Sequence, residues 1–288
     1  MSVSDELGLR IKGFYENISK TKLMRRTPAI IRIDGKAFHT FTRGFQKPFD
    51  EVLIKTMQET TKYLCENIQG CVLGYTQSDE ISLVLVDYQK LDTSAWFDYE
   101  VQKMCSIAAS MATMAFNKFF YKNSDDYANT DEVLTSLYSE DKNRKEETLK
   151  YLSVLSKANS KGAMFDARVF NIPKEEVTNY IYWRQLDATR NSIQMVGQAY
   201  FSHKELHCKS CNNIQDMLML QKGINWNNLP AYQKRGSCVV KAYYVEENSH
   251  KNGDNTEVER SRWIIDRNIP IFKGEDRKYI DKLIYVGE

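Results

Sequence analysis

The chain lacks several features that would place it in a specialised class of proteins. Its 288 residues hold 40 lysines and arginines against 38 aspartates and glutamates, and this net charge of +2 excludes a histone-like polycation. It has no run of about 20 apolar residues, so no membrane-spanning helix is expected. The start, MSVSDELGLR, carries acids and no apolar segment. We therefore expect neither a signal peptide nor a transit peptide, and a cytoplasmic location with the mitochondrion as the alternative.

Two common ligand-binding patterns are also missing. The chain has no GxxxxGK[ST] loop, which argues against a P-loop enzyme. Among its six cysteines only Cys208 and Cys211 form a CxxC pair, preceded by His203 and His207. Structural zinc sites usually combine two separated pairs of ligands, and a second CxxC is absent. We therefore expect no zinc and interpret the other cysteines as small reduced hydrophobes.

The composition that remains is that of a folded domain. Hydrophobic residues make up 42% of the chain and charged residues 27%, which is ample for a buried core. The charge is uneven: residues 1–50 hold 10 basic and 5 acidic side chains, whereas residues 124–150 hold 4 and 8. The small net charge is therefore compatible with a local basic surface.

The spacing of apolar residues predicts an α+β domain in the N-terminal part of the chain. The expected order is strand, helix, strand, strand, helix, strand, at residues 29–34, 50–68, 71–76, 81–87, 97–120 and 165–172. This order is typical of the ferredoxin-like, split-βαβ arrangement, with both helices on one face of an antiparallel sheet. Asp50 is the expected N-cap of the first helix. Residues 121–163 are polar and look like an insertion or a mobile excursion that is partly helical near ETLKYLSVL (147–155).

We divide the chain into two parts at residue 173. Residues 1–173 form the predicted catalytic domain, including the 121–163 insertion. Residues 174–288 look like an appended part with helices at 174–200 and 212–222 and two strands, 234–247 and 258–267, joined by a polar turn at 248–255.

Acidic residues stand at the ends of two strands that the predicted fold brings together. Asp34 ends the first strand, and Asp79 and Glu80 lie in the next hairpin turn. Converging carboxylates must hold a cation or take up a proton, and the Gly35 carbonyl can add a further oxygen ligand. Such ligands suit a pair of Mg2+ ions in phosphoryl or nucleotidyl transfer. In the alternative interpretation these residues only shape turns.

Basic residues near Asp34 fit a triphosphate substrate. Within fourteen residues of Asp34 the chain carries Lys36, His39, Arg43 and Lys47. Lys103, on the second helix, is expected to point toward the same place. In the long helix at 174–200, we expect Trp183 to pack against the sheet and leave the role of Arg184 open.

Several motifs in a fixed order resemble one enzyme family. They are RIDGKAFHTFTRGFQKPFDE (32–51), GYTQSDEISLVL (74–85), FDARV, WRQLDATRNSI, GINWNNLP and KRGS. Together they span residues 32–237, apart from the insertion, and resemble the tRNA-His guanylyltransferase family. The resemblance implies a polymerase-like palm that adds nucleotides to the 5' end of tRNA in the 3'-to-5' direction. ATP or GTP first activates the 5'-monophosphate, and the 3'-hydroxyl of an incoming triphosphate then attacks.

The resemblance also implies a role for individual residues. Two Mg2+ ions would be held by Asp34, Asp79 and the Gly35 carbonyl, while Glu80 matches an acid needed for activity. The positions that match nucleotide-contacting residues are Lys36, Ala37, Phe38, His39, Lys47, Asp50, Ser78 and Lys103. The tRNA-binding candidates are Arg184, Arg190, Asn191, Lys209, Lys234 and Arg235. Members of the family assemble as tetramers, so a homo-tetramer is expected.

The chain departs from the family pattern at one motif, which bears on the activity, and at two single positions, which bear on the triphosphate contacts. The guanylyltransferases carry His-Ile-Asn-Asn where this chain has Thr189-Arg190-Asn191-Ser192, and Glu100 and Phe49 replace an arginine and an asparagine. The first change favours the guanylyltransferase-like branch, which repairs tRNA 5' ends by copying the opposite strand. The alternatives are a tRNA-His guanylyltransferase and an RNA-binding protein without catalysis, although the retained acids argue against the second.

Overall fold

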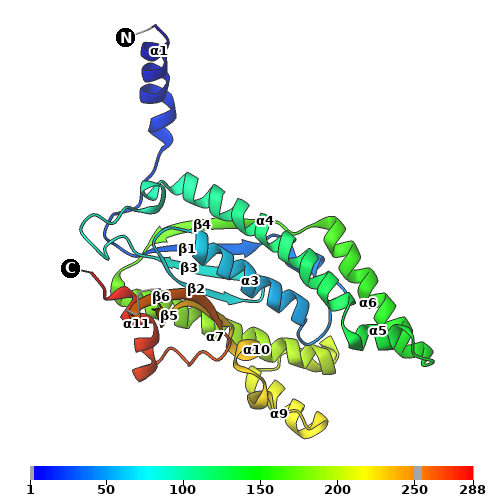
Figure 1. Ribbon diagram of the computed structural model, residues 1–288. Helices are drawn as coiled ribbons and strands as arrows, with labels where there is room; N and C mark the ends of the chain where they lie inside the picture. The colour runs from blue at the N-terminus through cyan, green and yellow to red at the C-terminus, as the bar shows by residue number, and fades with distance from the viewer. Residues whose placement is uncertain (1–2, 250–254, 288) are drawn as a thin grey trace.

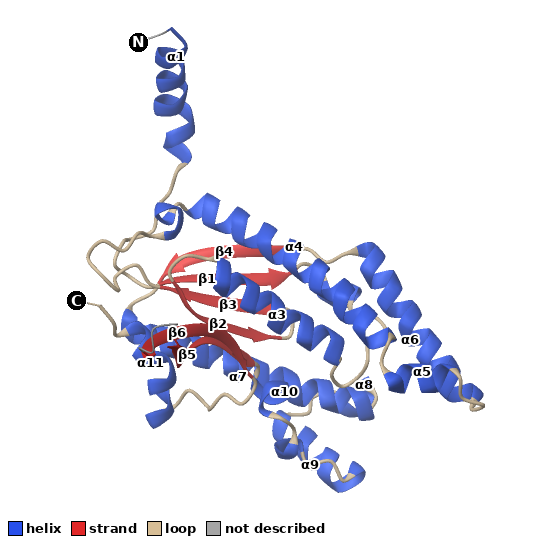
Figure 2. Cartoon of the chain, in the orientation of Figure 1, coloured by secondary structure: helices blue, strands red, loops and turns tan. Residues whose placement is uncertain are grey.

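The computed structural model describes residues 3–249 and 255–287, which form an α+β fold (Figures 1 and 2). Its strands are β1 (Ala29–Gly35), β2 (Cys71–Gln77), β3 (Glu80–Leu85), β4 (Phe165–Asn171), β5 (Ser237–Ser249) and β6 (Asn255–Asp266). Its α-helices are α1 (Val3–Ile11), α2 (Phe38–Phe41), α3 (Glu51–Asn67), α4 (Val101–Ala128), α5 (Asp131–Leu137), α6 (Lys142–Lys161), α7 (Lys174–Tyr200), α8 (His203–Leu206), α9 (Cys211–Lys222), α10 (Ala231–Arg235) and α11 (Lys278–Ile284). In the described ranges no helix is long and apolar enough to cross a membrane.

The strands form one six-stranded antiparallel sheet in the order β4-β1-β3-β2-β5-β6. Its first four strands, with α3 and α4, have the predicted split-βαβ topology. β5 pairs with β2, so the C-terminal part continues the same sheet rather than forming one of its own. Most of the expected turn between β5 and β6 lies outside the described residues.

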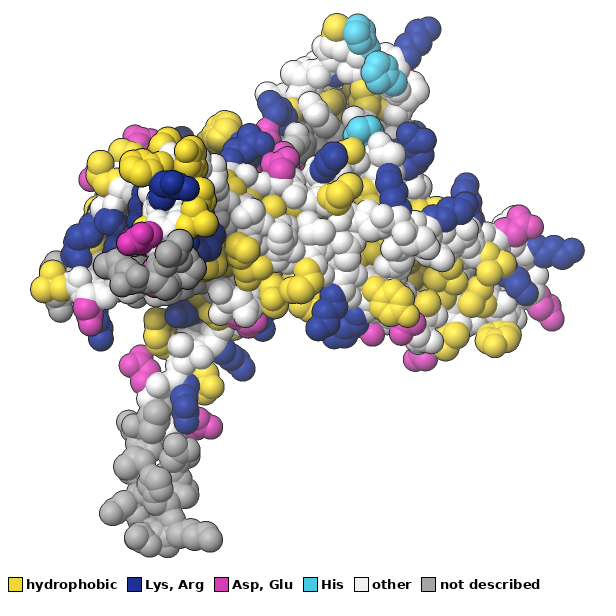
Figure 3. All heavy atoms as spheres, turned by 90° about the horizontal axis from the view of Figure 1, so that it is seen from above, with side chains coloured by type: hydrophobic (Ala, Val, Ile, Leu, Met, Phe, Trp, Pro, Cys, Tyr) yellow, Lys and Arg dark blue, Asp and Glu magenta, His cyan; other side chains and the backbone are white. Residues whose placement is uncertain are grey.

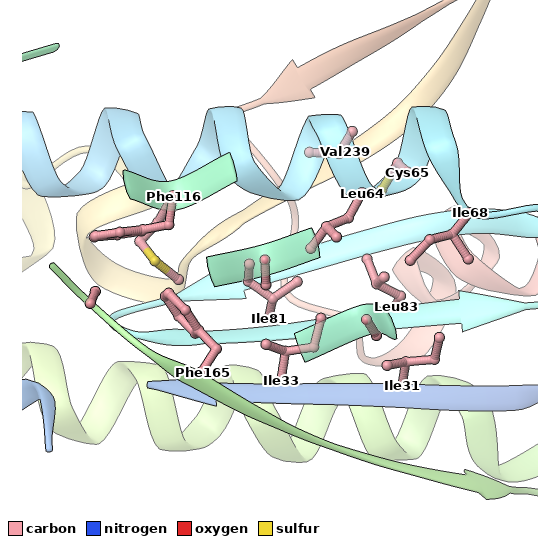
Figure 4. Packing of buried hydrophobic residues seen from close by; sticks show 14 of the residues in the cluster. Ile31, Ile33, Leu64, Cys65, Ile68, Ile81, Leu83, Phe116, Phe165 and Val239 are labelled. Atoms are coloured by element: carbon pink, nitrogen blue, oxygen red, sulfur yellow. The ribbon is translucent and has the colours of Figure 1, made fainter. Parts of the chain in front are cut away.

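The face of the sheet toward α3 and α4 holds the larger apolar core (Figure 4). Alternate residues of β1 and β3, such as Ile31, Ile33 and Leu83, point toward Leu64 of α3. This alternation follows from the period of two along a strand. The prediction that both helices cover one face is therefore confirmed.

The opposite face of the sheet is covered by α7 and α11. Ile30 of β1 and Val84 of β3 are buried in one cluster with Ile181 of α7 and Ile280 of α11. The chain thus folds into three layers, and β1 and β3 contribute apolar side chains to both cores. The polar residues discussed below lie at one end of the sheet, next to α7.

Residues 121–163 are part of the folded body, and the expectation of a mobile excursion is wrong. They form the end of α4, then α5 and α6, and α6 lies along α4 (Figure 1). Tyr151, Leu155 and Ala158 of α6 are buried in the larger core. These three residues are spaced by four and three positions, so they lie on one apolar face of a helix whose other positions are mostly polar. The polar composition of the whole segment therefore did not indicate that this face is packed.

Replacing a buried leucine of α6 tests whether this helix contributes to stability. Leu155 is 2% exposed, whereas Leu149 of the same helix is 49% exposed. We expect Leu155→Ala to lower the free energy of unfolding by about 2–5 kcal/mol through lost burial and a new cavity. Leu149→Ala is the matched control and should cost less than about 1 kcal/mol. Equal urea midpoints for the two variants would contradict the packing of α6.

Candidate active site

A cavity of about 590 Å³ lies at the end of β1, between the β2–β3 turn, the loop at residues 42–50 and α7. Most of the residues predicted to bind metal or nucleotide line it. They are Asp34, Gly35, Ala37, Phe38, His39, Lys47, Asp50, Ser78 and Asp79. The fold therefore brings together residues that the sequence spreads over 46 positions.

Asp34 and Asp79 meet because the hairpin turn docks on the end of β1. Asp34 pairs with Glu80 in the β1–β3 register, and the Gly35 N–H donates to the Asp79 carbonyl over 3.1 Å. Burial and the negative charge of Asp34 raise the pKa of Asp79, while a 3.0 Å bond from the Ser78 hydroxyl opposes the rise. Within the described ranges no lysine or arginine forms an ion pair with either aspartate.

This pair of carboxylates fits a divalent cation. These two acidic side chains have no lysine or arginine partner among the described residues, and the pKa of one is raised. A dication that neutralises their charge would therefore stabilise the folded protein. Mg2+ prefers oxygen ligands and is commonly bound by one or two carboxylates plus substrate phosphates. In the described part of the chain no three His, Cys, Asp or Glu side chains cluster to hold a metal, so a cation bound here would take further ligands from backbone, water or phosphate oxygens.

Glu80 points away from the cavity and into the interface between the sheet and α7. Arg184 of α7 donates to both of its carboxylate oxygens, over 2.7 and 2.9 Å, and Arg32 forms a further ion pair at 2.9 Å. Burial raises the pKa of Glu80, and the two arginines oppose this rise. Glu80 thus attaches α7 beside the aspartates, which is a positioning role.

Trp183 and Arg184 do not have the expected surroundings. Trp183, expected to pack, is 52% exposed, and its ring covers the guanidinium of Arg184 at 4.3 Å. Arg184, a tRNA-binding candidate, is 5% exposed and paired with Glu80 and Asp187, so that prediction is wrong. The reason is helical spacing: Arg184 lies three residues after buried Ile181 and four before buried Ala188.

From the segment after β1, Ala37, Phe38 and His39 line the cavity. Ala37 adopts a left-handed conformation (φ +54°), and the side chains of Lys36 and His39 are exposed. Phe38 packs in an aromatic cluster with Phe41, Phe116 and Phe165. A Cβ atom on Gly35 would lie 2.2 Å from the Phe38 ring, so glycine is required where this ring crosses the end of β1.

Lys103 does not reach the cavity. α4 is level with the end of β1 only at Thr113, whose hydroxyl accepts from the N–H of Phe165, the partner of Gly35. Lys103 lies about 15 Å earlier along the helix at 1.5 Å per residue. Its ammonium group sits over the Phe97 ring at 5.3 Å. The predicted contact between Lys103 and a triphosphate in the cavity of the same chain is therefore wrong, because α4 starts at the opposite end of the sheet.

The remaining tRNA candidates occupy two different surroundings. Arg190 is exposed on α7 and pairs with Asp187, and Asn191 lines a cavity of about 90 Å³ beside the first. Lys234 and Arg235 are half-buried in α10, and the Lys234 ammonium donates to the Asn227 carbonyl over 2.6 Å. These contacts orient the side chains but leave the tRNA assignments as predictions.

Lys209 belongs to a neighbouring cavity of about 550 Å³ that also contains the His-Cys motif. His203, His207 and Cys208 line this cavity, and Lys47 and Gln198 line both it and the first cavity. The His203 and His207 rings lie 6.3 Å apart. Figure 3 shows histidine side chains on a projecting lobe with lysine and arginine side chains around its base.

Several residues of the first cavity were not found by the sequence analysis. Thr42, Gln46, Met195 and Gln198 all line it. Met195 and Gln198 follow Asn191 at spacings of four and three, so they continue one face of α7. That periodicity was the available signal, but it could not show which face meets the cavity.

Removing Arg184 tests its role in attaching α7. Arg184→Met leaves the buried Glu80 carboxylate with Arg32 as its remaining ion-pair partner. We therefore expect the free energy of unfolding to fall by about 3 kcal/mol. Arg190→Met is the control, because Arg190 is 61% exposed and a surface ion pair contributes about 0–1 kcal/mol. Adding Glu80→Gln to Arg184→Met should restore part of the loss in urea unfolding. Equal losses for the two single variants would exclude the proposed attachment.

Comparisons with known sequences identify the family of the chain and several of its relatives. The family model described as tRNAHis guanylyltransferase matches residues 9–173, more than half of the chain. The tRNA(His) guanylyltransferase of Saccharomyces cerevisiae is 26% identical over 226 residues, covering 74% of this chain and 81% of the yeast protein. An uncharacterized protein of Acanthamoeba polyphaga mimivirus is 29% identical over 262 residues, covering 87% of this chain and 82% of the viral protein.

Solved structures show the same relationship. A bacterial tRNA(His) guanylyltransferase-like protein in complex with ATP matches with a TM-score of 0.75 and 40% identity, covering 98% of this chain and 100% of that chain. The S. cerevisiae enzyme shares the fold, with a TM-score of 0.57 and 22% identity over 79% of this chain and 92% of that chain. The chain therefore belongs to the tRNA-His guanylyltransferase family and is a nucleotidyltransferase.

Proposed function

We propose that the protein is a template-dependent 3'-to-5' nucleotidyltransferase that repairs the 5' end of tRNA. One observation carries the proposal: Asp34 and Asp79 converge in the wall of a 590 Å³ cavity without a cationic partner among the described side chains. The cavity is large enough for a nucleotide, because its volume lies within the usual range of ligand-binding pockets. Acid pairs of this kind support transfer of phosphate-linked groups through bound dications.

The residues around the cavity would have different roles in such a reaction. Asp34, Asp79 and the Gly35 carbonyl would hold two Mg2+ ions, which when bound supply Lewis-acid activation of the attacking and leaving oxygens. Lys47, in the loop at residues 42–50, lines the same cavity and would neutralise negative charge on a triphosphate. Ser78 lies beside Asp79 and orients its carboxylate through a hydrogen bond. His39 supplies a further polar group at the exposed side of the cavity.

ATP and GTP are the proposed activating substrates. Bacterial tRNA(His) guanylyltransferase-like proteins 40% and 38% identical to this chain have been solved in complex with ATP and with GTP. We propose that the tRNA 5'-monophosphate attacks the α-phosphate of either nucleotide and releases pyrophosphate. The 3'-hydroxyl of an incoming triphosphate then attacks the activated 5'-phosphate and releases the nucleoside monophosphate. We also propose a homo-tetramer as the working assembly.

The choice of repair over tRNA-His guanylation rests on α7. The positions of the family's His-Ile-Asn-Asn motif read Thr189-Arg190-Asn191-Ser192 here. Asn191 is common to both patterns and lines the small cavity next to the main one. Ser192, which replaces the last asparagine of the motif, lines the same cavity, so the change reaches its wall. The higher identity to guanylyltransferase-like structures than to the yeast enzyme supports the same choice.

Extension of truncated tRNAs tests the proposed activity. With Mg2+ and nucleoside triphosphates, we expect 5'-truncated tRNAs to be extended by the base complementary to the opposite strand. Asp34→Ala should lower kcat at least about 100-fold by removing a metal ligand. Asp98→Ala is the control, because Asp98 is exposed and pairs with Lys22 and Arg25, away from the cavity. Addition of guanosine alone, and only to full-length tRNA-His, would favour the guanylyltransferase instead.

Thermal unfolding with and without Mg2+ tests the metal site. The pKa of Asp79 is raised, so without metal the folded state loses stability as the pH rises through that pKa and Asp79 ionises beside Asp34. Mg2+ should therefore raise Tm at pH 7, and the increase should shrink as the pH falls toward the raised pKa. In Asp79→Asn the Mg2+ effect should vanish, whereas Asp98→Asn should retain it. An equal Mg2+ effect in wild type and Asp79→Asn would exclude this site.

A further inference from the structure

The residues of α6 have no role in the proposed function, yet α6 contacts a wall of the active-site cavity. That wall is the loop at residues 42–50, which contributes Thr42, Phe45, Gln46, Lys47, Pro48 and Asp50 to the cavity lining. Tyr151 and Val154 of α6 both contact the loop. The position of this wall therefore depends on an element that itself does not line the cavity.

The central contact is a hydrogen bond between Tyr151 and Asp50. The Tyr151 hydroxyl donates to Asp50 Oδ2 over 2.7 Å, and both residues are buried. The same oxygen accepts from the Gln46 N–H over 3.0 Å, and Oδ1 accepts from the Leu53 N–H, also over 3.0 Å. One carboxylate thus connects α6, the loop and the N-terminus of α3.

A second set of contacts supports the same loop from α4 and α6. The Gln46 side chain donates to the Tyr127 hydroxyl over 3.3 Å, and the Tyr127 ring packs edge-on against Tyr151 at 5.2 Å. Gly44 has φ +90°, and a Cβ atom there would lie 3.0 Å from a methyl group of Val154. The backbone of the loop therefore rests directly on α6.

We infer that Tyr151 is a positioning residue that holds the 42–50 loop in place for nucleotide binding. Lys47 follows Gln46 directly, so the bond network of Tyr151 and Asp50 restrains the backbone from which the Lys47 side chain extends. Ordering a loop before the ligand arrives removes an entropic cost from binding. The identity of the ligand as a triphosphate rests on the proposed function, but the restraint on the loop does not.

A single hydroxyl can be removed to test this inference. Tyr151→Phe keeps the ring and its packing but leaves Asp50 Oδ2 with one donor fewer. Tyr88→Phe is the matched control, because Tyr88 is also buried and donates one hydrogen bond, over 3.0 Å to the Ile284 carbonyl, on the α11 side of the sheet. The two variants should lose similar stability in urea unfolding.

Nucleotide binding distinguishes positioning from a purely structural role. By calorimetric titration with ATP and Mg2+, we expect Tyr151→Phe to bind about three- to tenfold more weakly than wild type, and Tyr88→Phe to bind as wild type does. In extension assays the KM for the nucleotide should rise by the same factor while kcat stays within about twofold. Equal affinity for ATP in wild type and Tyr151→Phe would overturn the inference.

Hydrogen exchange of the free protein gives a readout that needs no ligand. Peptides covering residues 42–50 should exchange faster in Tyr151→Phe than in wild type and should be unchanged in Tyr88→Phe. Unchanged exchange in Tyr151→Phe would overturn the inference even if the wild type bound no nucleotide. A different result is that the wild type extends no tRNA while Tyr151→Phe still shows faster exchange and weaker ATP binding than the wild type. That result would refute the proposed function and support the role of Tyr151.

Discussion

The antiparallel pairing of β1 with β3 places Asp34 opposite Glu80, and the geometry of the site follows from this register. It lets the Gly35 N–H bind the Asp79 carbonyl, which brings the second aspartate to the end of β1. It also turns Glu80 toward Arg184 on α7. A slip of one residue would turn every β3 side chain to the opposite face of the sheet, so it would separate the acids and bury Glu80 without its arginine.

The layers on the two faces of the sheet support the site in different ways. α3 and α4 pack on an apolar face, and the aromatic cluster around Phe38 places the segment after β1. α7 is attached through buried ionic contacts of Glu80, and such contacts are directional where apolar packing is not. α6 then supports the 42–50 loop from outside through Asp50. The elements that bound the cavity thus combine apolar packing with specific polar contacts.

Local signals in the sequence predicted some parts of this arrangement. Asp50 caps α3 as expected, because an N-cap depends on neighbouring residues only. The strands, the two covering helices and the convergence of Asp34 and Asp79 follow from apolar spacing and from the small number of split-βαβ connections. The predictions for Trp183, Arg184 and Lys103 failed because each depended on which face or which end of a helix meets the sheet.

The sequence by itself determined the order of the elements, the acids at the strand ends and the family, because those features reside in short motifs and in periodicity. Only the tertiary structure decided that Glu80 binds Arg184, that Lys103 lies far from the cavity, and that Tyr151 reaches Asp50 from 101 residues away. The physical reason is that packing between distant segments selects the partner of each polar side chain. Burial then fixes these pairings, because a buried polar group without a partner lowers the free energy of unfolding.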